Sequence, residues 1–160
     1  MARLDIATAQ ETSFLQAAAF FLALLATAFA LGGALAHALE LPAKIGMTRE
    51  DYFVVQRVYA GWDKLALVLG LQLIGMVALA WLYRARSEVL VPVLVALAGL
   101  IAAQVMFWIW TFPANVATDN WTVQPDNWEQ LRRQWEYSHF AGACFQLLAM
   151  AALIVAAIRR

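Results

Sequence analysis

Residues 14–36 read FLQAAAFFLALLATAFALGGALA, a run of 23 positions without a charged side chain. At the α-helical rise of about 1.5 Å per residue, such a run crosses the roughly 30 Å hydrocarbon core of a bilayer. The whole chain is 64% hydrophobic and only 14% charged, which is more apolar than a soluble domain needs to be. The sequence therefore predicts a membrane protein, with the lipid bilayer as a partner of its apolar helices.

Three further apolar runs follow the first, and together they predict a single all-α domain covering residues 1–160. The fold class is an integral membrane four-helix up-down bundle with spans at about residues 14–39, 62–84, 89–112 and 130–158. Proline disfavours a helical residue before it and breaks the helical hydrogen bonding. We therefore expect Pro42 to end the first span near Glu40, and Pro113 to interrupt the third after Phe112.

Two long polar segments connect these spans, one after the first span and one after the third. Thr48 is followed three residues later by Asp51, the arrangement of a helix-capping box, and aromatic and apolar residues then repeat at helical spacing. This pattern predicts an interfacial amphipathic helix between spans one and two, bent at Gly61 where it enters the second span. Between spans three and four we expect an ordered loop.

The distribution of charge gives an orientation and excludes one class of partner. Basic residues without acidic neighbours occur at Arg84 and Arg86 in the short middle turn, and at Arg159 and Arg160, which favours both termini on the cytoplasmic side of a multi-pass protein. The formal net charge is zero and no basic cluster is present, so nucleic acid is not an expected partner. The single cysteine, Cys144, excludes an intrachain disulfide.

Two histidine–glutamate pairs stand at corresponding ends of the first and last spans. Glu136 and His139 are three residues apart and share a helix face, and His37 and Glu40 repeat the pair in reverse order. If the first and last spans are antiparallel neighbours, the two imidazoles lie at one depth. Ionisable groups are costly in a membrane and therefore mark functional sites, so we take His139, His37 and Glu136 as the candidate catalytic residues.

Other aromatic and polar residues gather on the same side of the membrane and are predicted to line a substrate pocket. These candidates are Tyr59, Trp62, Trp108, Asn115 and Gln146. The alternative for the tryptophans is an interfacial aromatic belt. The alternative for the buried amides is hydrogen bonding between helices.

The residue types leave several chemistries open. Imidazoles and carboxylates suit iron, copper, manganese or zinc, and the candidate metal ligands are His37, Glu40, Glu136, His139 and Asp63. A second interpretation is a haem b whose iron is bound axially by the two histidines. A third is a cofactor-free site in which an imidazole acts as base. The fourth is a structural network of salt bridges closed by Arg133 and Lys44.

Three segments carry a resemblance to a known family. HALELPAK begins at His37, DYFVVQRVYAGW begins at Asp51, and FPANVATDNWTVQPDNWEQLRRQWEYSH begins at Phe112. They resemble the corresponding segments of small bacterial four-span proteins of the anthrone oxygenase-like family. That resemblance implies a membrane-embedded fold in the bacterial inner membrane, and an oxygenase-type activity like that of family members that oxidise anthrones to anthraquinones without an obvious bound cofactor.

These observations predict an integral membrane oxidoreductase, with oxygenase as its more specific form, acting on a small apolar substrate at a His/Glu site near the outer face. The alternative is a non-catalytic or haem-bearing subunit of a larger membrane complex. A homo-oligomer is compatible with both predictions.

Overall fold

A computed structural model describes residues 2–160, with side chains from Ser13 onward. Every regular element in this range is helical. Four helical stretches are long and apolar enough to cross a membrane: Ser13–Lys44, Trp62–Leu82, Ser87–Ala117 and Trp128–Ile158. The predicted all-helical chain with four membrane-crossing stretches is confirmed.

The elements follow one another along the chain as seven α-helical or π-helical segments and two short 3-10 turns. They are α1 (Ala2–Lys44), α2 (Arg49–Val55), the 3-10 turns η1 (Gln56–Tyr59) and η2 (Trp62–Lys64), α3 (Leu65–Leu82), α4 (Ser87–Met106), the π-helical η3 (Phe107–Thr111), α5 (Phe112–Ala117) and α6 (Trp128–Ile158).

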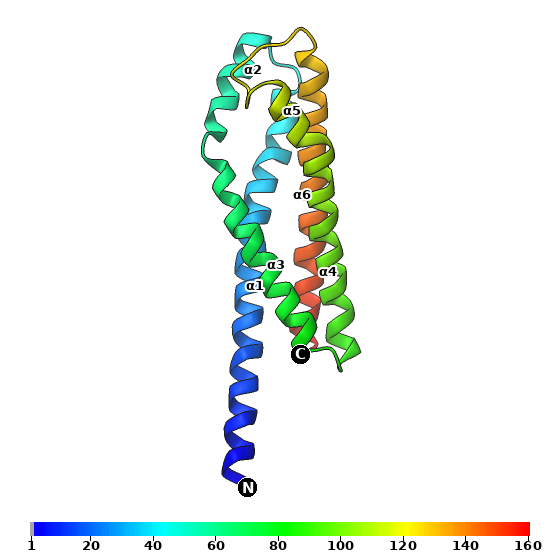
Figure 1. Cartoon of the computed structure of the whole chain (residues 1–160). Coiled ribbons are helices and arrows are strands. Elements are labelled where there is room, and N and C mark those ends of the chain that lie inside the picture. The colour runs from blue at the N-terminus through cyan, green and yellow to red at the C-terminus, as the bar shows by residue number, and fades with distance from the viewer. Residues whose placement is uncertain (1) are drawn as a thin grey trace.

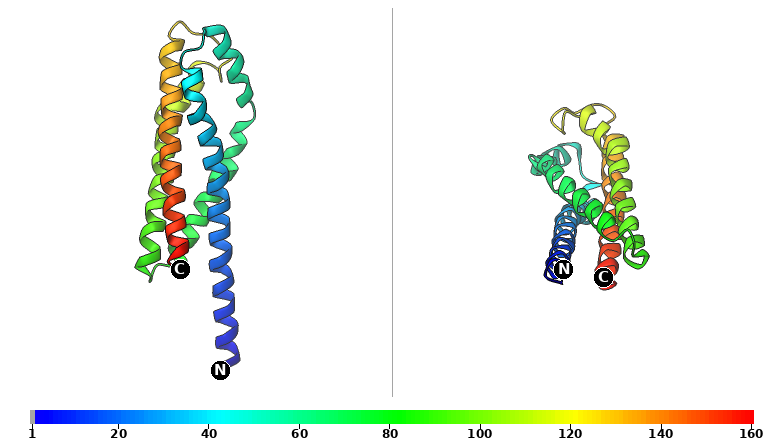
Figure 2. Two further views of the ribbon diagram at one scale, coloured as in Figure 1. Left: turned by 180° about the vertical axis from the view of Figure 1, so that it is seen from behind. Right: turned by 60° about the horizontal axis from the view of Figure 1, so that its bottom comes forward.

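The first and last long helices lie side by side. Helix α1 packs against α6 and α3, and α4 packs against α6 and α3. Figures 1 and 2 show both chain termini toward one end of the molecule, with α2 and the segment after α5 gathered at the other. This arrangement brings the C-terminal end of α1, which carries His37, beside the N-terminal part of α6, which carries His139.

Small residues allow the helices to approach closely. A Cβ atom added at Gly75 on α3 would lie 2.8 Å from the backbone nitrogen of Ala23 on α1. A Cβ atom at Gly99 on α4 would lie 3.0 Å from the carbonyl oxygen of Phe145 on α6. Such contacts are typical of membrane helices, whose association depends on close packing, and they hold α3 against α1 and α4 against α6.

The first span does not end near Glu40, because α1 passes through Pro42 and continues to Lys44. A proline near a helix end removes only one backbone donor, and the amide of Ile45 still donates to the carbonyl of Leu41 at 3.0 Å. The extra turn is held by Lys44, whose side chain is buried against α6. The predicted end was therefore one turn too early.

The third span also continues beyond Phe112, as far as Ala117. The turn before Pro113 is a π-helix, Phe107–Thr111, and its wider turn accommodates a residue that has no amide hydrogen to donate. The Gln134 side chain of α6 donates to the Trp110 carbonyl at 2.7 Å and so satisfies a backbone group within this irregular turn.

The start of α2 follows the sequence pattern. The Thr48 hydroxyl accepts a hydrogen bond from the Asp51 amide at 3.2 Å, as a capping residue does. The chain then breaks at Gly61, whose φ of +86° lies in the left-handed region that glycine tolerates best.

Candidate functional site

The two imidazoles are in ring contact. The His37 and His139 ring centroids are 4.2 Å apart, and His37 is only 7% exposed. Because the two residues come from α1 and α6, this contact confirms the prediction that the first and last spans bring the histidines together. These are the only histidines in the chain.

One nitrogen of His139 has its protonation set by the backbone. Its Nδ1 lies 2.9 Å from the carbonyl oxygen of Trp135, one helical turn earlier. A carbonyl oxygen only accepts hydrogen bonds, so Nδ1 carries the hydrogen and Nε2 of the neutral ring keeps its lone pair. The Nδ1 atom of His37 is buried and has no hydrogen-bond partner in the described part of the protein.

Aromatic rings enclose this pair of imidazoles. The His37 ring centroid lies 4.5 Å from that of Tyr59, 5.2 Å from Trp62 and 5.0 Å from Trp135. The Trp135 ring also lies 3.9 Å from His139. Tyr59 and Trp62, predicted as pocket residues, are thus in contact with His37, and the imidazoles lie in an apolar enclosure.

A buried ion pair adjoins the histidines. The Lys44 side chain is 2% exposed, Glu136 is fully buried, and Lys44 Nζ lies 2.9 Å from Glu136 Oε1. Lys44 Nζ also donates to the Tyr59 hydroxyl at 2.9 Å and lies 3.9 Å from the half-exposed carboxylate of Glu40. Buried charges require such pairing, and Lys44 joins both predicted carboxylates into one network.

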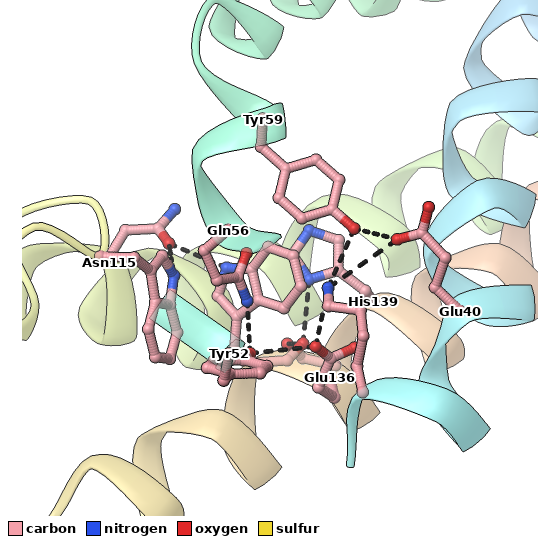
Figure 3. Close-up of polar contacts among 11 residues, drawn as sticks. Glu40, Tyr52, Gln56, Tyr59, Asn115, Glu136 and His139 are labelled. Atoms are coloured by element: carbon pink, nitrogen blue, oxygen red, sulfur yellow. Dashed lines mark hydrogen bonds and ion pairs between the residues drawn. The ribbon is translucent and has the colours of Figure 1, made fainter. Parts of the chain in front are cut away.

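Tyr52 and Gln56 of the same network were not predicted as site residues. The Tyr52 hydroxyl donates to Glu136 at 3.0 Å and accepts from the Gln56 side chain. Figure 3 shows this chain from Gln56 through Tyr52 to Glu136, and the separate contact of Tyr59 with Glu40. The four-residue spacing of Tyr52 and Gln56 places them on one helix face, but only the folding of α2 toward α6 shows that this face meets Glu136.

Both tyrosines are held in the protonated state. Burial raises the pKa of Tyr52, and the adjacent Glu136 carboxylate raises it further. Burial and the hydrogen bond to Glu40 raise the pKa of Tyr59. A protonated phenol is the form that donates a hydrogen bond to a carboxylate, so both contacts persist into alkaline solution.

We expect the raised pKa of Tyr52 to make stability depend on alkaline pH. Above about pH 10 the unfolded chain loses the tyrosine proton while the folded protein keeps it, so the free energy of unfolding falls by about 1.4 kcal/mol per pH unit. Below that pH the contribution is fully present. Unfolding in detergent between about pH 8 and 11.5 measures this slope. Tyr52→Phe is expected to remove the contribution of one proton, about 1.4 kcal/mol per pH unit, from this slope. Equal slopes in wild type and Tyr52→Phe would contradict this account.

The three remaining pocket candidates lie in different settings. The Asn115 Oδ1 atom accepts from Trp135 Nε1 at 2.8 Å and from Trp121 Nε1 at 3.2 Å, so Asn115 positions a ring that touches both imidazoles. Gln146 accepts a hydrogen bond from Gln72 of α3 at 2.8 Å. This is the hydrogen bond between helices that the sequence predicted as the alternative to a pocket role. Trp108 is 58% exposed and packs on neighbouring phenylalanine rings rather than on the imidazoles.

The observed arrangement of the carboxylates does not fit a metal centre. Among the described side chains, no group of three or more His, Cys, Asp or Glu residues is placed to hold a metal ion, and Asp63 is exposed. The ammonium of Lys44 lies between Glu136 and Glu40, where a cation bound by both would lie. Haem iron takes its axial imidazoles on opposite faces, and rings in contact leave no room for a macrocycle. Metal or haem binding stays a prediction that requires these groups to move.

Comparisons with protein-family models, with curated proteins and with solved structures find no match. The similarity to the anthrone oxygenase-like family therefore stays a prediction that rests on the three segments quoted above. The chemistry of the site has to be argued from its side chains. These offer one imidazole nitrogen with a free lone pair, a second imidazole in contact with it, and a buried ammonium nearby, all behind aromatic walls.

Proposed function

We propose that the chain is an integral membrane oxidoreductase of oxygenase type that acts on a small apolar carbon acid, with His139 as the base. The observation that carries the proposal is the hydrogen bond from His139 Nδ1 to the Trp135 carbonyl, because it leaves Nε2 unprotonated beside a second imidazole. A positioned imidazole is the commonest general base in enzymes and contributes about 10²- to 10⁴-fold to rate.

The proposed reaction needs only molecular oxygen as co-reactant. His139 Nε2 removes a proton from an activated CH₂ group, and the resulting carbanion gives up electrons to O₂. Overall, CH₂ and O₂ become C=O and H₂O, so the carbon is oxidised by four electrons and oxygen is reduced by four. A carbon acid whose anion is delocalised over an aromatic system meets this requirement.

An unpartnered imidazole nitrogen supports an anionic intermediate, whereas the charge of Lys44 is already balanced by carboxylates. The Lys44 ammonium lies 4.6 Å from the Trp135 ring centroid, and that ring packs on both imidazoles. The charge of this ammonium is paired with Glu136 at 2.9 Å and lies 3.9 Å from Glu40, so it adds no net positive charge beside the imidazoles. The unpartnered Nδ1 atom of His37 supplies a further polar contact for a substrate oxygen.

The proposal includes a location. We place the four spans in up-down order across a bacterial inner membrane with both termini in the cytoplasm, which puts the histidine site near the outer face. The basic residues of the short turn between α3 and α4 and of the C-terminus support this orientation.

The test uses the full chain purified in detergent or reconstituted in lipid vesicles, with anthrone as the probe. Oxygen uptake in the presence of anthrone, matched one to one by quinone formation, is the expected result. Elemental analysis and an absorption spectrum of the same sample distinguish a cofactor-free site from a metal or haem site. A bound transition metal or a haem absorption band would contradict the cofactor-free mechanism. Folded, metal-free protein with no uptake of oxygen above the uncatalysed rate would contradict the enzyme proposal and favour a non-catalytic subunit.

A further inference from the structure

We infer that an open groove between α1 and the start of α3 binds a small apolar molecule that carries an anionic oxygen, and admits it from the bilayer toward the histidines. The groove has a volume of about 380 Å³, which is within the usual range of small-molecule sites. Its role as an entry route rests on the proposed function, whereas its ability to bind such a molecule does not.

Apolar side chains and a glycine form the walls. Helix α1 contributes Phe29 and Gly33, and α3 contributes Leu65 and Val68. A Cβ atom at Gly33 would lie 3.3 Å from Leu65 Cδ1 and 3.8 Å from the Trp62 ring, so a bulky side chain at this position would extend into the groove. The adjacent Gly32 has no atom within 4 Å of its Cβ position, so a side chain there projects into open space.

Trp62 connects the groove with the candidate site. Its indole lines the groove and also meets the His37 ring edge to face, with centroids 5.2 Å apart. The Trp62 side chain is therefore in contact with both the groove and one imidazole. The proposed entry route runs past this side chain, so Trp62 is the residue that would have to turn aside.

The charge at the rim selects the kind of ligand. Among the side chains that the structure describes, Lys64 is the only charged one that lines the groove. It is exposed, and no ion pair involves it among the described side chains. Its Nζ lies 3.9 Å from the Cβ position of Gly61, close to the backbone at the mouth. An ammonium beside apolar walls favours a ligand with a carboxylate, phenolate or enolate oxygen at one end of a hydrocarbon body.

Two anthracene probes test this binding site, because anthracene accepts excitation energy from nearby tryptophan. 9-Anthracenecarboxylate and neutral 9-methylanthracene are titrated into the full-length protein in detergent, and the anthracene emission after tryptophan excitation is recorded. We expect saturable binding of the carboxylate. Gly33→Leu should weaken it at least about tenfold, equivalent to about 1.4 kcal/mol, and the matched control Gly32→Leu should leave it unchanged.

The same assay tests the role of the Lys64 charge in binding separately from the proposed role of His139 as base. Lys64→Gln should weaken binding of the carboxylate and leave 9-methylanthracene unaffected. His139→Ala should bind both probes as wild type does, so a failed activity assay and a failed binding assay are distinguishable. Equal effects of Gly33→Leu and Gly32→Leu, or transfer that rises without saturation in every variant, would overturn the inference and leave only partition of the probe into detergent.

Discussion

Glu136→Gln and Lys44→Met are each expected to destabilise the protein by about 3–5 kcal/mol, because either change breaks the buried ion pair and leaves its other member without its nearest counter-charge. The pair is separated by 2.9 Å, with the lysine 2% exposed and the glutamate fully buried. Equilibrium unfolding in detergent measures both losses. The double variant removes both charges and keeps an amide oxygen as acceptor for Tyr52, so it should lose far less than the sum of the single losses.

An exposed ion pair on the same helix is the matched control. Glu129 and Arg133 lie 3.6 Å apart on α6 and are both more than half exposed. Such surface pairs contribute about 0–1 kcal/mol, so Glu129→Gln should have little effect. If Glu136→Gln destabilised the protein no more than Glu129→Gln, the buried ion pair would not be part of the folded protein.

His139→Ala is expected to lower oxygen uptake with anthrone by about 10²- to 10⁴-fold, because it removes the general base. The fold should be retained, since His139 makes its hydrogen bond within its own helix, to Trp135. Tyr137→Phe, two residues away and exposed, is the control and should retain full activity.

A base role has a signature that a structural role lacks. Added imidazole should restore part of the activity of His139→Ala, since it can enter the space that the side chain vacates. It should not change the activity of Tyr137→Phe. Unchanged activity in His139→Ala, or a loss accompanied by unfolding that imidazole does not reverse, would count against His139 as the base.

Much of the fold was predictable from the apolar runs alone. The contact of the two histidines was predictable because each lies three residues from a glutamate, in opposite order on the first and last spans. A helix of known rise places residues 37 and 139 at matching depths once the first and last spans are neighbours. Trp62 and Tyr59 were likewise predictable as neighbours of the site, because both stand where the second span begins, at the same end of the bundle as His37.

Lys44 was predicted only within one alternative, a salt-bridge network in which Arg133 was named beside it, and not as the centre of the site. Its position depends on α1 continuing through Pro42, against the local preference of proline. The stabilisation that carries the helix forward comes from the contact with Glu136, which is distant in sequence. Tyr52 was missed for a similar reason, since its partner is decided by how a short helix folds back on the bundle.

The central claim is that the two imidazoles lie side by side, and solid-state NMR of the protein in lipid bilayers with ¹³C,¹⁵N-labelled histidine tests it most directly. The chain contains only two histidines, so any cross peak between two different imidazoles reports on His37 and His139. At a centroid separation of 4.2 Å, we predict a strong ring-to-ring cross peak and a His139 ring protonated at Nδ1. Two sharp ring systems with no cross peak between them would contradict the account.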